Sequence, residues 1–424
     1  MEKTKHVVVI GGGFAGVNLI QHLTNVSGIT VTLVDKNNYN FFPPLLYQVS
    51  TGFLDVSNIS YPFRKLFHRK KNTRFRLGEL QEVMPQSKTV RLTTGELSYD
   101  ILILATGTES NYFGIENIKR AAIPMKTVDD AINMRNAILM KMEQATRTED
   151  PRQRAQLTRI VVTGGGPSGV EVCGMLAEMR ANIFKKDYPE LADQPVEIYL
   201  VDGAPSLLGP MSKAAQQYTL KTLTEMGVIV KLDKMVKDYQ DGAVVFADGE
   251  RIETELLIWT AGVTSSVFAG IPKESYGRGR RLLVNPYNQL EGCEDIYAIG
   301  DTCLQVSDPG FPEGHPQLAQ VAIQQGRNVA RNLKAALTNR PAEPFVYTDK
   351  GSLAIIGRNK AVADLQSPNI RFQGFFAWLA WLFVHLFSLI HSRNKFFTFY
   401  NWAIAFFTKD QALRIIVKPE SPKE

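Results

Sequence analysis

Two glycine-rich stretches carry the residue types that can hold the pyrophosphate of a dinucleotide. They are Gly11-Gly12-Gly13-Phe14-Ala15-Gly16 and, 153 residues later, Gly164-Gly165-Gly166-Pro167-Ser168-Gly169. In this pattern the first two spaced glycines permit a tight turn and a close approach of the backbone to the ligand, and the third lets a helix pack against a strand. The N–H groups at the start of that helix favour negative charge. The repeat predicts two nucleotide-binding units, which hold two dinucleotides, or one dinucleotide beside a structural relic.

The elements that must position these turns flank them on both sides. A short apolar strand precedes each turn, at residues 7–10 and 160–163, and a helix follows it. A second strand then ends on an acid, which is Asp35 in the first unit and Asp202 in the second. A carboxylate at this place holds a ribose hydroxyl.

Asp202 also distinguishes between the two forms of the nicotinamide cofactor. An acid there accepts a hydrogen bond from the ribose 2′-hydroxyl and repels a 2′-phosphate. No Arg or Lys occurs from residue 203 to residue 212 to hold that phosphate. The second unit is therefore expected to prefer NADH over NADPH.

Three further strand ends are expected beside the nucleotides. A buried strand ends in Ala105-Thr106-Gly107, and a parallel strand in the second half ends at Ala261-Gly262. Small residues there let a strand pass close under a dinucleotide. Gly300 and Asp301 follow another strand, where the glycine lets a loop approach a cofactor and the acid can bind the ribityl or pyrophosphate region. Paired prolines in residues 37–48 predict an extended, irregular segment instead of a helix.

Glu171 and a row of glutamines are candidates for further chemistry. Glu171 occupies the position of Asn18 in the first unit. It either stabilises the helix start through the helix dipole, or acts as a buried acid near the reacting rings. Gln320 and Gln324 share one face of a predicted helix, with Gln317 three residues before them. Their amides either hold a carbonyl-bearing substrate or face solvent.

Composition excludes several other classes of protein. The chain of 424 residues is 44% hydrophobic and 21% charged, as in globular proteins, and its net charge of +6 is too mild to indicate nucleic acid. A basic run at residues 64–76 is either a solvated face or a membrane-facing patch. The three cysteines form no CxxC or CxxxxC pair, which argues against a disulfide reductase, and the scattered histidines predict no metal site.

The C-terminal region changes character. Residues 375–390 are almost wholly apolar, and a second aromatic-rich segment covers residues 396–407. Basic residues bound these segments at Arg393, Lys395 and Lys409. Two amphipathic helices of this kind predict an interfacial membrane anchor; a transmembrane hairpin and a dimer interface are the alternatives.

Together these motifs resemble those of the type II NADH:quinone oxidoreductases, or alternative NADH dehydrogenases, and the resemblance covers essentially the whole chain. Its most specific motif is Ala319-Gln320-Val321-Ala322-Ile323-Gln324, which is similar to the AQxAxQ quinone-site pattern of that family. The segments 259–263 and 298–301 also match. Thr260 stands where alanine is common, and little effect is expected from it.

The resemblance implies that FAD binds the first unit and NADH the second. The residues expected to contact FAD are Gly11, Gly13, Phe14, Ala15, Gly16, Asp35, Lys36, Ala105, Thr106, Gly107, Gly300, Asp301, Ala319 and Gln320. Those expected to contact NADH are Gly164, Gly166, Pro167, Ser168, Gly169, Glu171, Asp202, Ala261 and Gly262. Glu171, Gln320 and Gln324 are the implied catalytic residues, which orient the quinone and support proton delivery.

The fold that the resemblance implies is α/β, with two Rossmann-like domains and a C-terminal amphipathic helical membrane anchor. The expected FAD domain is discontinuous, at residues 1–112 and 293–370; the NADH domain covers 113–292 and the membrane helices 371–424. The implied reaction passes a hydride from NADH to FAD and two electrons to a membrane quinone, without proton pumping. The implied protein is a homodimer, peripheral at the cytoplasmic face of the cell membrane.

Two other classes share parts of this pattern. A sulfide:quinone oxidoreductase has the same fold and tail, but it needs a pair of redox cysteines near the flavin, which the positions of Cys173, Cys293 and Cys303 do not suggest. A flavin-loaded redox sensor or scaffold would bind FAD yet oxidise almost no NADH.

Overall fold

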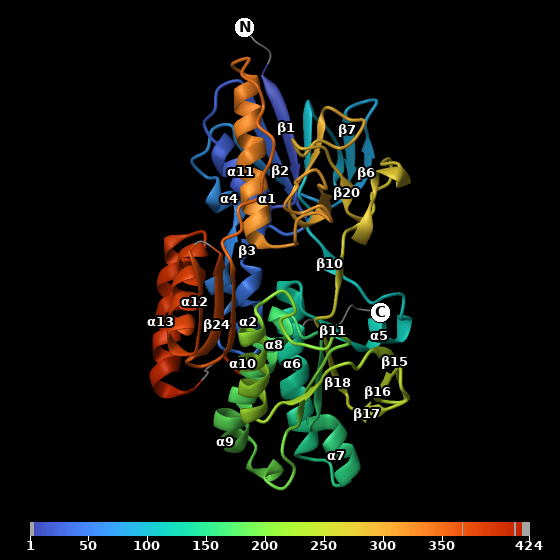
Figure 1. The fold of residues 1–424 in the computed structure, drawn as a ribbon, viewed down its shortest axis with the longest axis vertical. Coiled ribbons are helices and arrows are strands. Elements are labelled where there is room, and N and C mark those ends of the chain that lie inside the picture. Colours follow the sequence, from blue (N-terminus) through green and yellow to red (C-terminus); the bar gives the residue numbers. More distant parts are fainter. Residues whose placement is uncertain (1–3, 367, 411–412, 418–424) are drawn as a thin grey trace. The chain divides into compact units, whose positions relative to one another are not determined.

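The computed structural model describes residues 4–366, 368–410 and 413–417. Contacts within the chain divide it into two compact units. The first comprises residues 1–41, 61–109 and 263–349, and the second comprises residues 42–60, 110–262 and 350–424. Each unit has an α/β design built on a parallel sheet (Figure 1).

The centre of the first unit is a five-stranded parallel sheet in the order β21-β9-β1-β2-β5. Its strands are β1 (Lys5–Ile10), β2 (Ile29–Asp35), β5 (Thr73–Leu77), β9 (Ile101–Leu104) and β21 (Ile296–Ala298). Val9 is paired with Leu33 on one side and with Ile103 on the other. The inner strand β1 is apolar and buried from Val7 onward because both of its faces are covered.

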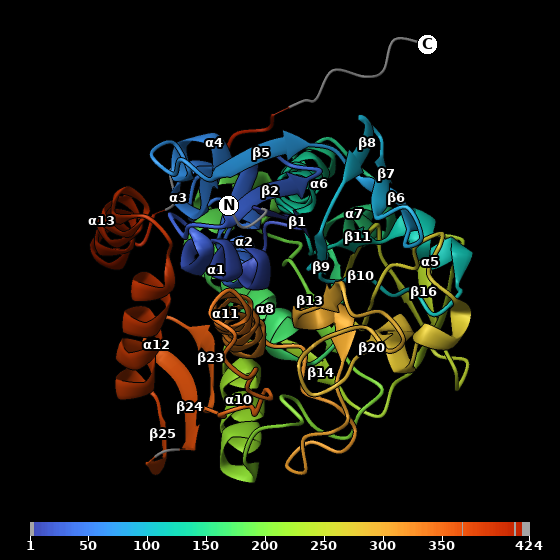
Figure 2. The ribbon, with the colours of Figure 1, turned by 90° about the horizontal axis from the view of Figure 1, so that it is seen from above.

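Two helices of the first unit lie side by side, α1 (Phe14–Leu23) and α11 (Ala319–Ala336), as Figures 1 and 2 show. A Cβ at Gly326 of α11 would lie 2.5 Å from the Ala15 oxygen, so only glycine allows this approach. The sheet also shares an apolar cluster with the antiparallel strands β6 (Leu80–Met84) and β7 (Thr89–Leu92), which β8 (Gly95–Ser98) extends.

The second unit repeats the parallel design in the order β11-β18-β12-β13-β14. Its strands are β11 (Ile123–Pro124), β12 (Ile160–Thr163), β13 (Ile198–Val201), β14 (Ile229–Lys231) and β18 (Leu256–Trp259). The main helices are α6 (Val128–Ala145), α8 (Pro167–Met179) and α10 (Lys213–Glu225). A capping box starts α6, where the Asp130 N–H donates to Thr127 Oγ1 (3.1 Å) and the Thr127 N–H donates to Asp130 Oδ2 (2.9 Å).

The C-terminal region packs onto α8 and belongs to the second unit by its contacts. Strands β23 (Ser352–Gly357), β24 (Lys360–Gln366) and β25 (Asn369–Gln373) form an antiparallel sheet. Helices α12 (Phe375–Ser388) and α13 (Ser392–Thr408) follow, and α12 packs on β24. The side-chain amide of Asn394 on α13 donates to the carbonyl oxygens of Asn58 (2.8 Å) and Ser60 (3.0 Å). None of the helices in the described ranges is long and apolar enough to cross a membrane.

The units defined by contacts differ from the predicted domain boundaries. Residues 263–292 lie with the first unit instead of the predicted NADH domain, and residues 350–370 lie with the second. The predicted membrane segment is part of the second unit, although its residues 411–412 and 418–424 lie outside the described ones. The expectation that residues 37–48 lack a helix is wrong at the end of that segment, because α2 (Leu46–Ser50) begins there after a 3₁₀ turn at Pro43–Leu45.

We predict that Gly174→Ala destabilises the fold. A Cβ at Gly174 on α8 would lie 1.7 Å from the Ile356 oxygen on β23, so helix and strand would have to separate. Overpacking of this kind costs about 1–3 kcal/mol, which a lower midpoint of thermal unfolding would reveal. Gly209→Ala is the control, because a Cβ there meets open space. Equal unfolding midpoints for both variants and wild type would contradict this account.

Candidate functional site

The first glycine turn has the geometry of a nucleotide cradle. Gly11 has a φ of +103°, and a Cβ there would lie 2.3 Å from the Ala105 oxygen. A Cβ on Gly16 would lie 2.0 Å from the Gly11 oxygen, whereas one on Gly13 would meet nothing within 4 Å. No side chain caps α1, whose N-cap is Gly13. Gly11 and Gly16 are therefore required for close packing. Gly13 is open and lies at the uncapped start of α1, where a pyrophosphate fits.

Asp35 lies where the sequence predicts a ribose-binding acid. Its Oδ2 accepts the Gly12 N–H at 2.6 Å, and its Oδ1 accepts the Asn37 N–H at 2.7 Å. Burial raises the pKa of Asp35, while these two hydrogen bonds and the charge of Lys36 lower it in part. The hydrogen bonds fix the carboxyl group, and each oxygen keeps a lone pair for a ligand hydroxyl.

Gly300 and Ala15, both predicted to contact FAD, meet in the first unit. A Cβ on Gly300, where φ is +73°, would lie 3.2 Å from the Ala15 Cβ. The Gly300 N–H donates to Gln325 Oε1 on α11 at 2.7 Å. The structure thus joins the first turn of α1 to the loop that contains Gly300, as a single binding site would require. Asp301 follows in the same loop, and Ala319 is the first residue of α11.

The second glycine turn reproduces the first. A Cβ on Gly164 would lie 2.8 Å from the Thr260 carbonyl carbon, and one on Gly169 would lie 1.9 Å from the Gly164 oxygen, while Gly166 again faces open space. Asp202 accepts the Gly165 N–H through Oδ2 and the Ala204 N–H through Oδ1 (2.6 Å for the latter). The second unit therefore has the same turn geometry as the first, with Asp202 fixed against the turn as Asp35 is.

Thr260 has a structural role that the sequence did not indicate. Its hydroxyl donates to the Thr163 oxygen at 2.6 Å and lies 3.2 Å from the Gly164 oxygen. It therefore ties the end of β18 to the glycine turn, a bond that alanine does not make.

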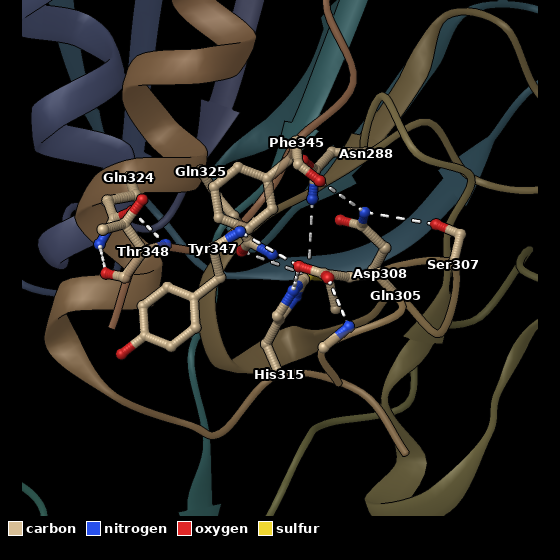
Figure 3. Close-up of polar contacts among 12 residues, drawn as sticks. Asn288, Gln305, Ser307, Asp308, His315, Gln324, Gln325, Phe345, Tyr347 and Thr348 are labelled. Atoms are coloured by element: carbon tan, nitrogen blue, oxygen red, sulfur yellow. Dashed lines mark hydrogen bonds and ion pairs between the residues drawn. The ribbon is translucent and has the colours of Figure 1, made fainter. Parts of the chain in front are cut away.

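The two predicted quinone glutamines contact one short segment of the first unit, and Figure 3 shows the contact of Gln324 with Thr348. Gln324 Nε2 donates to the Thr348 oxygen at 2.9 Å, and the Thr348 N–H donates to Gln324 Oε1 at 3.1 Å. Gln320 Nε2 lies 3.5 Å from Asp349 Oδ1, which also accepts the Tyr347 hydroxyl at 3.3 Å. Gln324 thus imitates a strand partner for Thr348, so a quinone would have to displace one of these bonds or bind beside them.

Glu171 is a buried acid and not an exposed helix-start residue. It lies on α8 and is 8% exposed. Burial raises the pKa of Glu171 to about 8, although the Ile355 backbone and the Trp381 indole lower this pKa in part. Trp381 is fully buried, and its Nε1 makes no hydrogen bond of ordinary geometry with a described residue. Glu171 therefore keeps its proton at neutral pH, which favours the acid interpretation.

A polar and aromatic cluster beside Glu171 was not predicted from the sequence. Trp402 Nε1 donates to Gln48 Oε1 at 2.7 Å, and Gln48 Nε2 donates to the Tyr47 hydroxyl at 2.8 Å. The His385 ring stacks on Trp381 at 3.9 Å, and burial lowers the pKa of His385 to about 4, so it is neutral. The available signal was a histidine and tryptophans inside an otherwise apolar segment.

A second unpredicted feature is a buried pair in the first unit, Asp308 and His315 (Figure 3). His315 Nε2 lies 2.8 Å from Asp308 Oδ2, which also accepts the Tyr347 N–H at 3.1 Å. Burial raises the pKa of Asp308, but the hydrogen bonds from His315 and from the Tyr347 and Gly310 backbones outweigh it and hold the pKa low. The pair fixes the loop before α11 to the segment that holds Gln320 and Gln324.

The cysteines do not resemble a redox pair. Cys173 and Cys303 are buried, and burial raises the pKa of Cys303 to about 11 and that of Cys173 further. All three cysteines are unpaired. A buried thiol of raised pKa is unreactive, because the thiolate is the nucleophile.

Two complete nucleotide cradles without a redox disulfide define a two-dinucleotide flavoprotein oxidoreductase. The chain matches the family model for pyridine nucleotide-disulphide oxidoreductases over residues 5–326, and the NDH2 C-terminal domain over residues 350–409. The chain belongs to the type II NADH:quinone oxidoreductase family.

Three comparisons illustrate this placement. A type II NADH:quinone oxidoreductase of Mycobacterium tuberculosis is 34% identical, over 94% of this chain and 88% of that protein. The structure of NDH2 from Plasmodium falciparum in complex with NADH has the same fold, with a TM-score of 0.89, 21% identity and coverage of 98% and 100%. The sulfide:quinone oxidoreductase of Aquifex aeolicus shares the fold more distantly, with a TM-score of 0.73, 19% identity and coverage of 96% of both chains.

We predict that Asp202 selects the nicotinamide cofactor. Wild-type kcat/KM for NADH should exceed that for NADPH by ~10-fold or more, because the carboxylate repels a 2′-phosphate. Asp202→Asn should narrow this ratio, mainly by weakening NADH binding. Steady-state kinetics with both cofactors measures it, and equal wild-type values would remove Asp202 from cofactor selection.

Proposed function

We propose that this protein oxidises NADH and reduces a quinone, with FAD as the resident cofactor. The observation that carries this conclusion is the second, intact cradle, which opens the same helix that holds Glu171. Membership of the type II NADH:quinone oxidoreductase family supports the same reaction. FAD bound in the first unit would supply the two-electron redox chemistry that links NADH oxidation to quinone reduction.

The residues of the first unit fit FAD and those of the second fit NADH. Gly13 leaves room for a pyrophosphate, and Asp35 is fixed for a ribose hydroxyl. Lys36, Thr106 and Gly107 complete the proposed FAD site, with the residues from Gly11 to Gly16 and those around Gly300. Gly166 and Asp202 hold NADH in the same manner, with Pro167, Ser168, Ala261 and Gly262 around them.

Glu171 is the proposed proton donor for the quinone. An acid with a pKa of about 8 is protonated at neutral pH and yet releases its proton to a stronger base. Gln320 and Gln324 are the proposed groups that orient the quinone carbonyls. We propose that the reaction takes place without proton pumping, as the resemblance to the type II NADH:quinone oxidoreductases implies.

The face formed by α12 and α13 is the proposed membrane attachment. Many large apolar side chains are exposed there, such as Phe376 (73%), Phe383 (62%) and Phe407 (81%). Lys395 Nζ donates to the Phe387 oxygen at 3.0 Å, which keeps a cation at the edge of this face. Aromatic amphipathic helices with basic edges lie in the interfacial plane of a bilayer. We propose a peripheral position at the cytoplasmic face; a homodimer is compatible with it.

We predict that Glu171→Gln keeps the fold and the FAD but loses most quinone turnover, because the amide carries no transferable proton. Loss of a general acid costs ~100-fold or more. Stopped-flow reduction of the flavin by NADH should persist, and reoxidation by a soluble quinone should slow. In wild type, turnover should fall as pH rises through about 8, as Glu171 deprotonates.

Glu178→Gln is the matched control for this prediction, because Glu178 is a second acid of raised pKa on the same helix. It should leave both the turnover and its pH profile in place. If Glu171→Gln matches wild type in steady-state rate and pH profile, Glu171 has no part in the mechanism.

We predict that Gln324→Leu raises KM for the quinone without slowing flavin reduction by NADH. The change removes both amide bonds to Thr348 and the polar group that a quinone carbonyl would contact. One lost hydrogen bond of this kind is worth about 0.5–1.5 kcal/mol, so KM should rise several-fold. Gln21→Leu on exposed α1 surface serves as the control. An unchanged KM would exclude Gln324 from quinone binding.

A further inference from the structure

A pocket with no role in the proposed reaction lies within the second unit, between α8, the β23–β24 hairpin and the two C-terminal helices. Its volume of about 460 Å³ is in the range of small-molecule sites. None of the residues expected to contact FAD, NADH or quinone lines it. Its apolar wall includes Met175, Trp378, Leu382, Trp402 and Phe406.

Three cations line this pocket, and the charges of two of them, Arg358 and Lys360, act on the neighbouring acid Glu178. Arg358, Lys360 and Lys409 line it, and none of them forms an ion pair with a carboxylate of the described residues. The Arg358 guanidinium is held over the Phe406 ring at 4.4 Å and donates to the Phe406 oxygen. A fixed guanidinium that lines the same pocket as two ammonium groups is the kind of donor set that proteins use for phosphate.

The three acids that line the same pocket are already engaged. Glu225 pairs with Lys221 at 3.9 Å, and Asp410 pairs with Arg414 at 2.5 Å. Glu178 accepts the backbone N–H of Arg358. Burial raises the pKa of Glu178, and its hydrogen bond from the Arg358 backbone and the charges of Arg358 and Lys360 offset this rise only in part.

The pocket continues into an apolar groove between α12 and α13. This groove has a volume of about 470 Å³, and Trp378, Leu382, Trp402 and Phe406 belong to both cavities. Its remaining wall is formed only by apolar side chains, among them Leu379, Phe383, Phe399 and Phe407. A cationic pocket that opens into an apolar groove matches a molecule with a phosphate at one end and a hydrocarbon chain at the other. A quinone headgroup is neutral and leaves the three cations unmatched.

We propose that this pocket binds the phosphate of a membrane glycerophospholipid, with one acyl chain of that lipid in the groove between α12 and α13. The assignment rests on the proposed attachment of these helices to a membrane. The bound lipid would hold the protein at a defined depth through specific contacts, in addition to the general attraction of an apolar face for a bilayer.

The test is photo-crosslinking of the FAD-loaded protein in vesicles that contain phosphatidylglycerol with a diazirine-bearing acyl chain. Mass spectrometry of the digested protein should place the label on the groove walls of α12 and α13. Lys360→Gln/Lys409→Gln should reduce this label about tenfold, because two charged donors are lost. Flotation with vesicles should change little.

Arg393→Gln/Lys395→Gln is the matched control, since it removes the same charge from the other end of the membrane face. It should weaken flotation but leave the groove label per bound protein intact. Equal groove labelling in both double variants, or label confined to exposed side chains such as Phe376, would overturn the proposal. Ala181→Trp, which fills the pocket from an exposed position, should also abolish the label.

Two further measurements distinguish a lipid from free phosphate, and the lipid site from the redox reaction. If inorganic phosphate raises the unfolding midpoint of wild type but lipid never labels the groove, the site takes free phosphate and the lipid assignment fails. NADH oxidation with a soluble short-chain quinone should be unchanged in Lys360→Gln/Lys409→Gln. Loss of labelling with full activity therefore supports the lipid site, whereas an inactive wild type that still labels would refute only the proposed function.

Discussion

The structure depends on one steric constraint, the contact between the backbone of each glycine turn and the next strand end. At Gly11 a single carbon would strike the Ala105 carbonyl, and at Gly164 it would strike Thr260. Because no side chain intervenes, each turn lies flat on its sheet and presents its middle glycine outward. The acid at the end of the second strand then reaches the turn and accepts its N–H, as Asp35 and Asp202 both do. The two repeated units therefore use the same arrangement, in which a glycine turn packs on the backbone of a neighbouring strand end and donates an N–H to an acid.

The sequence was informative where a feature depends on neighbours along the chain. The turns and their strands followed from local spacing, as did the two C-terminal helices. The pair of Asp308 and His315 could not be predicted because the segment around Tyr347, which Asp308 contacts, is distant from it in the sequence. The prediction for residues 37–48 was wrong at the end of that segment because prolines are tolerated in a first helical turn, and Pro43 begins the 3₁₀ turn that leads into α2. Glu171 was ambiguous for a similar reason, since its environment is built by strands and helices from beyond residue 350.

The environment of Glu171 differs from that of its counterpart in the first unit, Asn18. The side-chain amide of Asn18 donates a hydrogen bond to the Phe14 oxygen within its own helix. Glu171 lies instead beneath β23 and the fully buried Trp381, where desolvation favours the neutral carboxyl group. Helices α1 and α8 follow equivalent glycine turns. The surroundings of Asn18 and Glu171 differ because β23 and Trp381 cover Glu171.

The contact between Gly174 and Ile356 shows that the C-terminal region also packs against the core of the second unit. Judged by its apolar composition alone, that region is an attachment that could be trimmed to leave the rest of the enzyme intact. However, β23 packs directly against α8, the helix that holds Glu171. A shortened chain ending before residue 350 would admit water to Glu171, and its pKa would return toward that of an ordinary carboxylic acid. Such a chain would lose the raised pKa of Glu171 together with the proposed membrane-attachment face, because the same C-terminal region provides both.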